Sequence, residues 1–148
     1  MRQLLTNNGP ATGLAGPPSV VLVPASIPSI GIARAALRLA LDEHDWENDP
    51  VFRVLLGTTE AIANAVEHGS ERDGRVEVTY QVTDVQCYVR IVDGGCGTPW
   101  RPPVAPKPPS IQSERGRGLV LMTNLAQSVE VRSAGVGTEV RMSFTRHI

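Results

Sequence analysis

The chain has 148 residues, a formal net charge of −1, and 41% hydrophobic against 20% charged residues, a composition typical of one soluble globular domain. The balanced charge gives no basic surface for nucleic acid or for an anionic membrane. No apolar run approaches the ~20 residues of a membrane helix. The N-terminus lacks the apolar segment of a signal peptide, so we expect a cytoplasmic protein. Cys87 and Cys96 are too few for a disulfide framework and are expected to be reduced thiols.

The N-terminal segment 1–18 is rich in Gly, Pro, Asn and Thr, which predicts a flexible tail ahead of a folded domain over 19–148. A short strand is predicted at 19–26. Because Pro24 cannot donate a hydrogen bond to a neighbouring strand, we expect this strand at an edge of its sheet.

Two helices are predicted next. The first covers 28–44, with Ser29 as its N-cap and apolar residues at helical spacing. The second covers 50–68, because Asp49 can cap it, a proline fits its first turn, and Gly69 is a natural stop.

The remaining chain predicts two hairpins, separated by a long Gly- and Pro-rich loop and a third helix. The expected segments are strands at 75–84 and 85–93, a loop at 94–118, a helix at 119–127, and strands at 128–133 and 137–146. This order of elements predicts an α+β domain, a two-layer α/β sandwich with helices on one face of a mixed, mostly antiparallel sheet.

The second predicted helix carries an unusual polar pair. Glu60 and Asn64 lie four residues apart, away from the centre of the apolar face. They could simply face solvent. However, Asn is a poor helix-interior residue, and the small neighbours Gly57 and Ala63 leave room for a ligand beside the helix.

The stretch "IVDGGCG" places a carboxylate, Asp93, at a strand end just before glycines that allow close approach of a ligand. Such a carboxylate can accept a hydrogen bond from an exocyclic amine such as that of adenine. An ordinary turn is the alternative. The stretch is neither the phosphate loop GxxxxGK[ST] nor the dinucleotide motif GxGxxG.

The stretch "ERGRGL" places glycines at the start of the third helix, where free N–H groups and the positive helix end can bind phosphates. Arg115 and Arg117 add donors suited to phosphate oxygens. The alternative is a flexible entry to the helix. A third glycine turn, "GVGTEV", brings Thr138 to the start of the last strand.

Together and in this order, these motifs resemble those of the GHKL ATPases, the superfamily of gyrase B, Hsp90, the histidine kinases and MutL. The resemblance covers roughly residues 19–146 and implies the Bergerat ATP-binding fold. The matching residues are Glu60 and Asn64 of the N box, Asp93, Gly95 and Gly97 of the first glycine box, Gly116, Gly118 and Leu119 of the second, and Gly137 and Thr138 of a later Gly-Thr pair.

Within the superfamily, the chain is most similar to bacterial anti-sigma factor serine/threonine kinases of the RsbW and SpoIIAB type. The stretches "EAIANAVEHG", "ERGRGL" and "GIARAALRLAL" carry this similarity. It implies an ATP- and Mg²⁺-dependent kinase that phosphorylates an anti-anti-sigma (STAS-type) partner and sequesters a sigma factor, and it implies a homodimer. A regulatory module that binds ATP without kinase activity is the alternative. The loop "TPWRPPVAPKPP" departs from these relatives in its proline content.

The resemblance also implies roles for single residues. Glu60 would be the general base, Asn64 a ligand of Mg²⁺, and Asp93 the acceptor of the adenine amine. Arg34 on the first helix would contact the partner protein, although a solvated helix position is the alternative. The remaining ligands of the nucleotide would be Gly95, Gly97 and Thr138 around the adenine, and Arg115, Gly116, Arg117, Gly118 and Leu119 around the phosphates.

Overall fold

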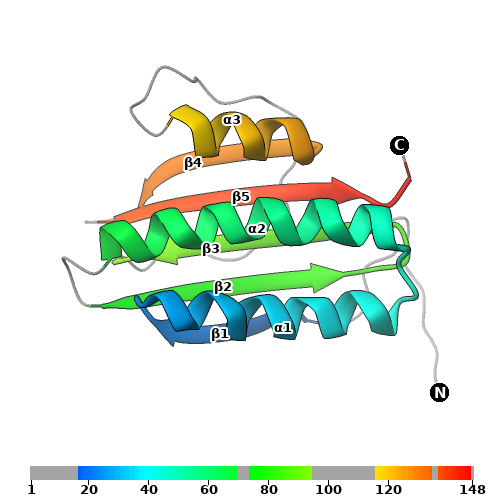
Figure 1. Cartoon of the computed structure of the whole chain (residues 1–148), viewed down its shortest axis with the longest axis horizontal. Coiled ribbons are helices and arrows are strands. Elements are labelled where there is room, and N and C mark those ends of the chain that lie inside the picture. Colours follow the sequence, from blue (N-terminus) through cyan, green and yellow to red (C-terminus); the bar gives the residue numbers. More distant parts are fainter. Residues whose placement is uncertain (1–16, 70–73, 95–115, 135–136, 148) are drawn as a thin grey trace.

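The computed structural model describes residues 17–69, 74–94, 116–134 and 137–147, and the side chains of all of these except 68–69, 116–120 and 133–134. These residues form three helices and five strands, whose arrangement is drawn in Figure 1. In chain order they are β1 Ser19–Pro24, α1 Ile27–Glu43, α2 Asn48–Gly69, β2 Arg75–Val82, β3 Gln86–Asp93, α3 Gly116–Leu125, β4 Ser128–Ala134 and β5 Gly137–Thr145.

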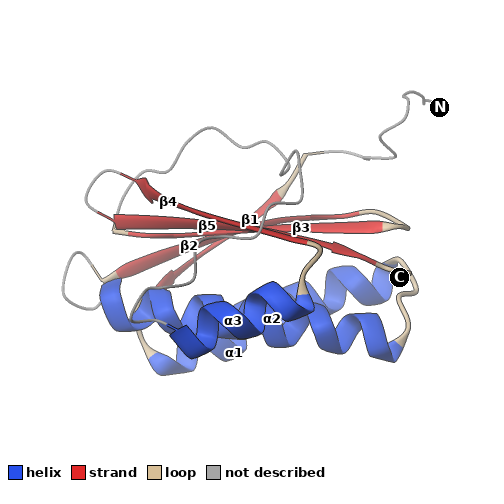
Figure 2. Cartoon of the chain, turned by 90° about the horizontal axis from the view of Figure 1, so that it is seen from above, coloured by secondary structure: helices blue, strands red, loops and turns tan. Residues whose placement is uncertain are grey.

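The strands form one sheet in the order β1-β2-β3-β5-β4, and all four pairings are antiparallel. All three helices lie on the same face of this sheet (Figure 2). The predicted two-layer α+β sandwich is confirmed, and β1 is an edge strand as predicted from its proline. The sheet is antiparallel throughout the described strands, so the parallel pair that a mixed sheet would contain is absent there.

The strands bury the face that their alternation predicts. Val76, Val78, Tyr80 and Val82 of β2 all point into the core and are at most 8% exposed. Asp84 lies in the turn between β2 and β3, where the Thr83 hydroxyl accepts hydrogen bonds from the backbone N–H groups of Val85 and Gln86. The hairpin predicted around Asp84 is therefore confirmed.

The first helix begins earlier than predicted. It starts at Ile27 after Ser26, and Ser29 is a buried residue inside it, so the predicted Ser29 N-cap is wrong. The reason is Pro28, which lies in the first turn, where its missing N–H has no partner to lose. Ser26 has the extended backbone of an N-cap, and its Oγ lies 3.1 Å from the Oγ of Ser29.

The second helix begins at Asn48, so Asp49 lies in its first turn and is not the predicted cap. Its C-terminal end at Gly69 and the first-turn position of Pro50 are as predicted. The apolar face is buried as its spacing predicts, through Val51, Val54, Leu55, Thr58, Ala61, Ile62, Ala65 and Val66.

The helices divide the sheet between them. α1 packs over β1 and β2, α2 packs over the centre of the sheet, and α3 packs against α2 and β4 (Figures 1 and 2). The predicted tail over 1–18 and the predicted loop over 94–118 lie largely outside the described residues. Within the described ranges, no helix is both long and apolar enough to cross a membrane.

Candidate functional site

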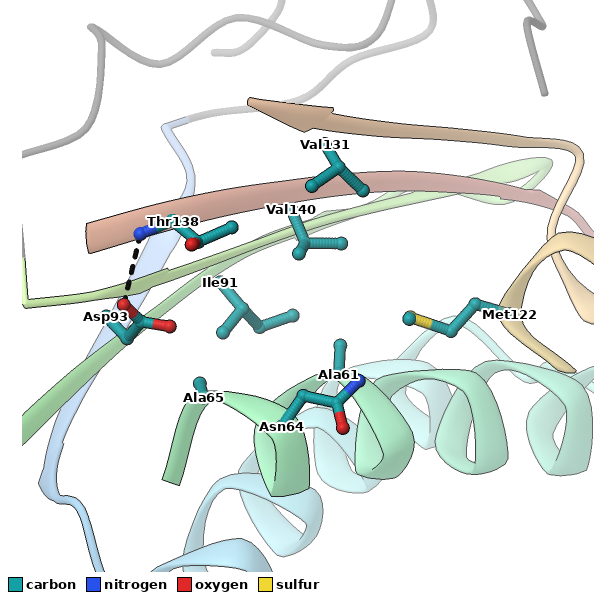
Figure 3. Close-up of a pocket in the computed structure, with 9 residues that line it drawn as sticks. All are labelled: Ala61, Asn64, Ala65, Ile91, Asp93, Met122, Val131, Thr138 and Val140. Atoms are coloured by element: carbon teal, nitrogen blue, oxygen red, sulfur yellow. Dashed lines mark hydrogen bonds between the residues drawn. The ribbon is translucent and has the colours of Figure 1, made fainter. Parts of the chain in front are cut away.

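A hollow lies between the sheet and helices α2 and α3 (Figure 3). About 350 Å³ of space free of protein atoms lies in the hollow and at its mouth, and this volume includes open solvent. The residues that line it are Ala61, Asn64, Ala65, Ile91, Asp93, Met122, Val131, Thr138 and Val140.

One end of the hollow is formed by the carboxylate of Asp93, the last residue of β3. Asp93 is only 4% exposed, and its Oδ1 accepts a hydrogen bond from the backbone N–H of Thr138 at 3.0 Å. The two residues are direct partners across β3 and β5. This bond orients the carboxylate. It also brings together two stretches that the sequence analysis singled out, "IVDGGCG" with Asp93 and "GVGTEV" with Thr138.

Gly137 lies directly against this carboxylate. A Cβ at position 137 would overlap the carbonyl oxygen of Asp93 and come within 2.8 Å of its Oδ1. Real Cβ atoms do not approach so closely, so β5 can begin beside Asp93 only with glycine at this position.

The walls of the hollow are apolar. Ile91 and Val140 are paired across β3 and β5, one step inside Asp93 and Thr138, while Met122 closes the space from α3. These wall residues were not among the predicted site residues. The two-residue period of the strands identifies Ile91 and Val140, because each shares a face with a motif residue two positions away.

Of the two polar residues of α2, Asn64 lines the hollow and Glu60 does not. Asn64 is half-buried and lines it together with Ala61 and Ala65. Glu60, one helical turn earlier, is also half-buried but does not line this space. In Figure 3, Ala65, Asn64 and Ala61 follow one another along α2 away from Asp93. Glu60 directly precedes Ala61 in the sequence of this helix.

The other predicted ligands of a nucleotide fall into two groups. Gly95, Gly97 and Arg115 lie outside the described residues. The first turn of α3, described by its backbone alone, contains Gly116, Arg117, Gly118 and Leu119. The prediction that glycines open this helix is confirmed, although the helix begins three residues before the predicted start at 119.

Arg34 is exposed on α1, on a different element from the residues of the hollow. Cys87 is a free cysteine with no exposed surface, and burial raises the pKa of its thiol well above the ordinary value. Cys87 is therefore a reduced thiol, as predicted, and it is protonated in the core. Cys96 lies outside the described residues.

The side-chain chemistry around the hollow suits a purine base. The buried carboxylate is an acceptor for an exocyclic amine, and the apolar walls suit a flat ring. The carboxamide of Asn64 offers the hard oxygen that Mg²⁺ prefers, with phosphate oxygens and water as its usual remaining ligands. Among the described residues, no group of three His, Cys, Asp or Glu side chains forms a metal site made by the protein alone.

An antiparallel sheet covered by helices on one face, with a hollow that ends in a buried carboxylate, defines a two-layer α+β ligand-binding domain. The chain belongs to the family described as the histidine kinase-like ATPase domain, which matches residues 23–144. The resemblance to the GHKL superfamily inferred from the motifs is thus confirmed, and an ATPase domain is expected to bind ATP.

Two similar proteins are both named anti-sigma F factor. The one from Bacillus velezensis is 28% identical over 123 residues, which cover 78% of this chain and 82% of that protein. The one from Bacillus licheniformis has the same identity and coverage. The names of these two proteins agree with the similarity to anti-sigma factors that the sequence motifs indicated.

The fold is also similar to a crystal structure of the RsbU and RsbW domains of a Mycobacterium tuberculosis protein. The TM-score is 0.65 at 20% identity, and the match covers 87% of this chain but 32% of the other. The chain therefore spans about a third of that two-domain chain, and the likeness concerns the fold.

Proposed function

We propose that the chain is an ATP-dependent serine/threonine kinase that phosphorylates an anti-anti-sigma (STAS-type) partner and sequesters a sigma factor in the cytoplasm. The observation that carries the nucleotide part is the buried Asp93 carboxylate, fixed by the Thr138 N–H at the end of an apolar hollow. The anti-sigma part is supported by the two Bacillus proteins with that name.

The residues of the hollow would hold the base of the nucleotide. Asp93 accepts a hydrogen bond from the adenine amine, while Ile91 and Val140 contact the ring face. Gly137 keeps β5 close enough for Thr138 to orient the carboxylate. In the proposal, Gly95 and Gly97 complete this part of the site.

The phosphates would extend along α2 away from Asp93, past Asn64 and towards Glu60. Asn64 supplies its side-chain oxygen to Mg²⁺, which when bound neutralises charge on the phosphates. The N–H groups of the first turn of α3 hold phosphate oxygens, because a helix N-terminus has free donors and a partial positive charge. The arginines of this stretch, Arg115 and Arg117, add charge.

Glu60 would act as the general base. Its carboxylate takes the proton of the serine or threonine hydroxyl of the partner as that oxygen forms a bond to the γ-phosphorus. The bond from the γ-phosphorus to the bridging oxygen breaks at the same centre, and ADP leaves. The role is supported by the place of Glu60, which is half-buried and does not line the hollow, so a hydroxyl of a second protein could approach it from outside.

The nucleotide assignment is tested by titrating ATP with Mg²⁺ into wild type and into Asn64→Ala. We expect binding to wild type and at least a tenfold loss in Asn64→Ala. The matched control is Asn124→Ala, because Asn124 is an exposed carboxamide on α3. Equal affinity of all three proteins would rule out the role of Asn64.

The kinase assignment is tested with Glu60→Gln and an anti-anti-sigma protein as the phosphate acceptor. We expect ATP binding to be retained and phosphate transfer to fall by at least 100-fold, in the range typical of general-base removal. Glu67→Gln, at an exposed position on the same helix, is the control. Transfer that survives in Glu60→Gln would remove the base role, and no transfer by wild type would favour the ATP-binding regulatory module.

Arg34 is proposed as a contact for the partner protein, because it is an exposed cation on the helix that carries the anti-sigma-like stretch. We expect Arg34→Glu to weaken partner binding. Unchanged affinity for the partner in this variant would show that Arg34 is only a solvated surface residue.

A further inference from the structure

A second cavity lies at the corner of the fold where α1 ends, β1 begins and β2 ends. About 440 Å³ of space free of protein atoms lies in this cavity and at its mouth, and this volume includes open solvent. It shares no lining residue with the hollow that contains Asp93. The two spaces are therefore separate sites, and the proposed kinase chemistry uses none of the residues at this corner.

Tyr80 of β2 presents an unused hydroxyl to this cavity. Its side chain lines the cavity and only 8% of the residue is exposed. Among the described residues, the hydroxyl forms no hydrogen bond, and it is not sealed among protein atoms either. Buried phenol groups usually find a hydrogen-bond partner. The Tyr80 hydroxyl is thus available to a ligand that enters the cavity.

The cavity is negatively charged. Glu43, in the last turn of α1, contributes a carboxylate that forms no ion pair within the part of the chain that the structure describes. The last turn of α1 contains no basic residue, so the negative end of this helix is not compensated there. The described residues that line the cavity include neither Lys nor Arg. This environment favours a cation.

The backbone of β2 adds an acceptor. The Ala25 N–H donates to the Gly74 carbonyl next to the β1–β2 ladder, which fixes the alternation of the ladder and directs the carbonyl of Val82 to the same side. In this register the residue opposite Val82 is Pro17, which has no N–H to donate. Both residues line the cavity, so the Val82 carbonyl is left to a ligand.

His44 forms a further wall with a fixed orientation. Its Nδ1 donates to the Asp84 carboxylate at 2.9 Å, because a carboxylate only accepts. The other ring nitrogen, Nε2, is then an acceptor in the neutral imidazole. Arg146 donates to the His44 carbonyl, but its charge is balanced by the carboxylate of Glu47. The groups that the cavity offers are therefore mainly acceptors.

From these groups we infer that the cavity binds a primary ammonium group. The three N–H donors of an ammonium match three acceptors, which are the Glu43 carboxylate, the Tyr80 hydroxyl and the Val82 carbonyl. The alkyl chain of the ligand lies against Ala40, the apolar residue of α1 that lines the cavity. A free alkylamine and the lysine side chain of another protein present this same group.

Titration of full-length protein with n-butylammonium at neutral pH, without nucleotide, tests this inference by nuclear magnetic resonance. We expect saturable shifts of the amides around the cavity in wild type, and affinity lower by about tenfold or more in Glu43→Gln. Asp42→Asn is the matched control, because Asp42 carries the same charge but is exposed and paired with Arg38. It should bind as wild type does. No saturable binding to wild type, or equal affinity in Glu43→Gln, would overturn the proposal.

A second variant separates a built site from general attraction of cations to an acidic surface. Tyr80→Phe removes only the hydroxyl, so the fold should survive, which circular dichroism checks. We expect the affinity for n-butylammonium to fall by about two- to tenfold, the worth of one hydrogen bond. Butan-1-ol, the uncharged probe of similar length, should not bind. Wild-type affinity in Tyr80→Phe, or equal binding of butan-1-ol, would contradict recognition of an ammonium group.

A capped lysine, Nα-acetyl-lysine N-methylamide, distinguishes the two sources of the ammonium. If it binds more tightly than n-butylammonium, the site takes a lysine side chain of a partner protein. If n-butylammonium binds more tightly, the site takes a small free amine. ATP affinity should be unchanged in Glu43→Gln, because the cavity shares no lining residue with the hollow, so this test is independent of the proposed kinase function.

Discussion

Gly137 affects both the packing of β5 against β3 and the position of Asp93 in the hollow. We expect Gly137→Ala to lower the free energy of unfolding by about 1 to 3 kcal/mol, the usual cost of overpacking, because its Cβ would overlap the Asp93 carbonyl oxygen. Relief of this overlap must move Asp93, so ATP affinity should also fall. Urea unfolding and ATP titration measure the two effects.

Gly31→Ala is the matched control for this substitution. A Cβ at Gly31 meets nothing within 4 Å, and the residue lies inside α1. Alanine is favoured over glycine by about 0.5 to 1 kcal/mol in a helix interior, so we expect stabilisation and unchanged ATP affinity. If Gly137→Ala and Gly31→Ala have the same stability and the same ATP affinity, the site does not depend on a glycine at position 137.

At the residue scale, the sequence identified the polar members of the hollow. Asn64, Asp93 and Thr138 were found because side-chain chemistry or adjacent glycines marked them, and the structure brings them to one space. The apolar wall was missed, since Met122 looks like any other core residue until α3 is placed against the sheet. Ser29 was misassigned as a cap because a serine resembles a cap wherever a helix start is uncertain.

At the element scale, Arg146 connects three separate parts of the chain beyond the end of β5. Its guanidinium donates to the carboxylate of Glu47 at 3.0 Å, to the Asp84 carbonyl at 2.9 Å and to the His44 carbonyl at 3.3 Å. It also donates to the Asp45 carbonyl, where the backbone has a positive φ of 58°. The α1–α2 connection and the β2–β3 turn are therefore fixed to the end of β5.

We expect Arg146→Ala to lower the thermal unfolding midpoint clearly, and Arg146→Lys not to restore it. A lysine ammonium cannot replace a planar group that reaches several carbonyls and a carboxylate at once. Arg132→Ala is the control, because the Arg132–Glu130 pair is exposed on both sides, and such pairs contribute little. Equal midpoints for Arg146→Ala and Arg132→Ala would contradict a special role for Arg146.

The same contact predicts a pH dependence. The hydrogen bond from Arg146 lowers the pKa of Glu47 below its ordinary value of 4.5. A lowered pKa means that folding favours the ionised carboxyl, so the stabilisation is complete above about pH 4.5 and disappears as pH falls through the folded-state pKa. The difference in midpoint between wild type and Glu47→Gln should therefore shrink in acid. A difference that stays constant with pH would exclude this coupling.

At the scale of the whole molecule, the sequence predicted the layers but not the strand order. Local periodicity shows which residues of β2 and β3 are buried, and their short connection places them side by side. The insertion of β5 between β3 and β4 depends on contacts far apart in the chain, such as Asp93 with Thr138, which no local pattern contains. In the sequence, residues 94–137 separate Asp93 from Thr138, so no local pattern connects the two.

One core joins the helices to all parts of the sheet, which predicts cooperative unfolding of the whole domain. Leu37 of α1 has no exposed surface, so Leu37→Ala should cost about 2 to 5 kcal/mol and shift all probes together. Trp46 is the local probe, because its indole N–H donates to the Thr83 carbonyl at 2.9 Å between the α1–α2 connection and the end of β2.

With Trp100→Phe as the background, fluorescence reports on Trp46 and far-ultraviolet circular dichroism reports on the whole domain. The two urea transitions should coincide in wild type and in Leu37→Ala. Leu39→Ala, on the exposed side of the same helix, should change the midpoint little when measured in dilute protein. If the Trp46 signal changes at lower urea than the circular dichroism, α1 and its connection unfold separately, and the core does not act as one unit.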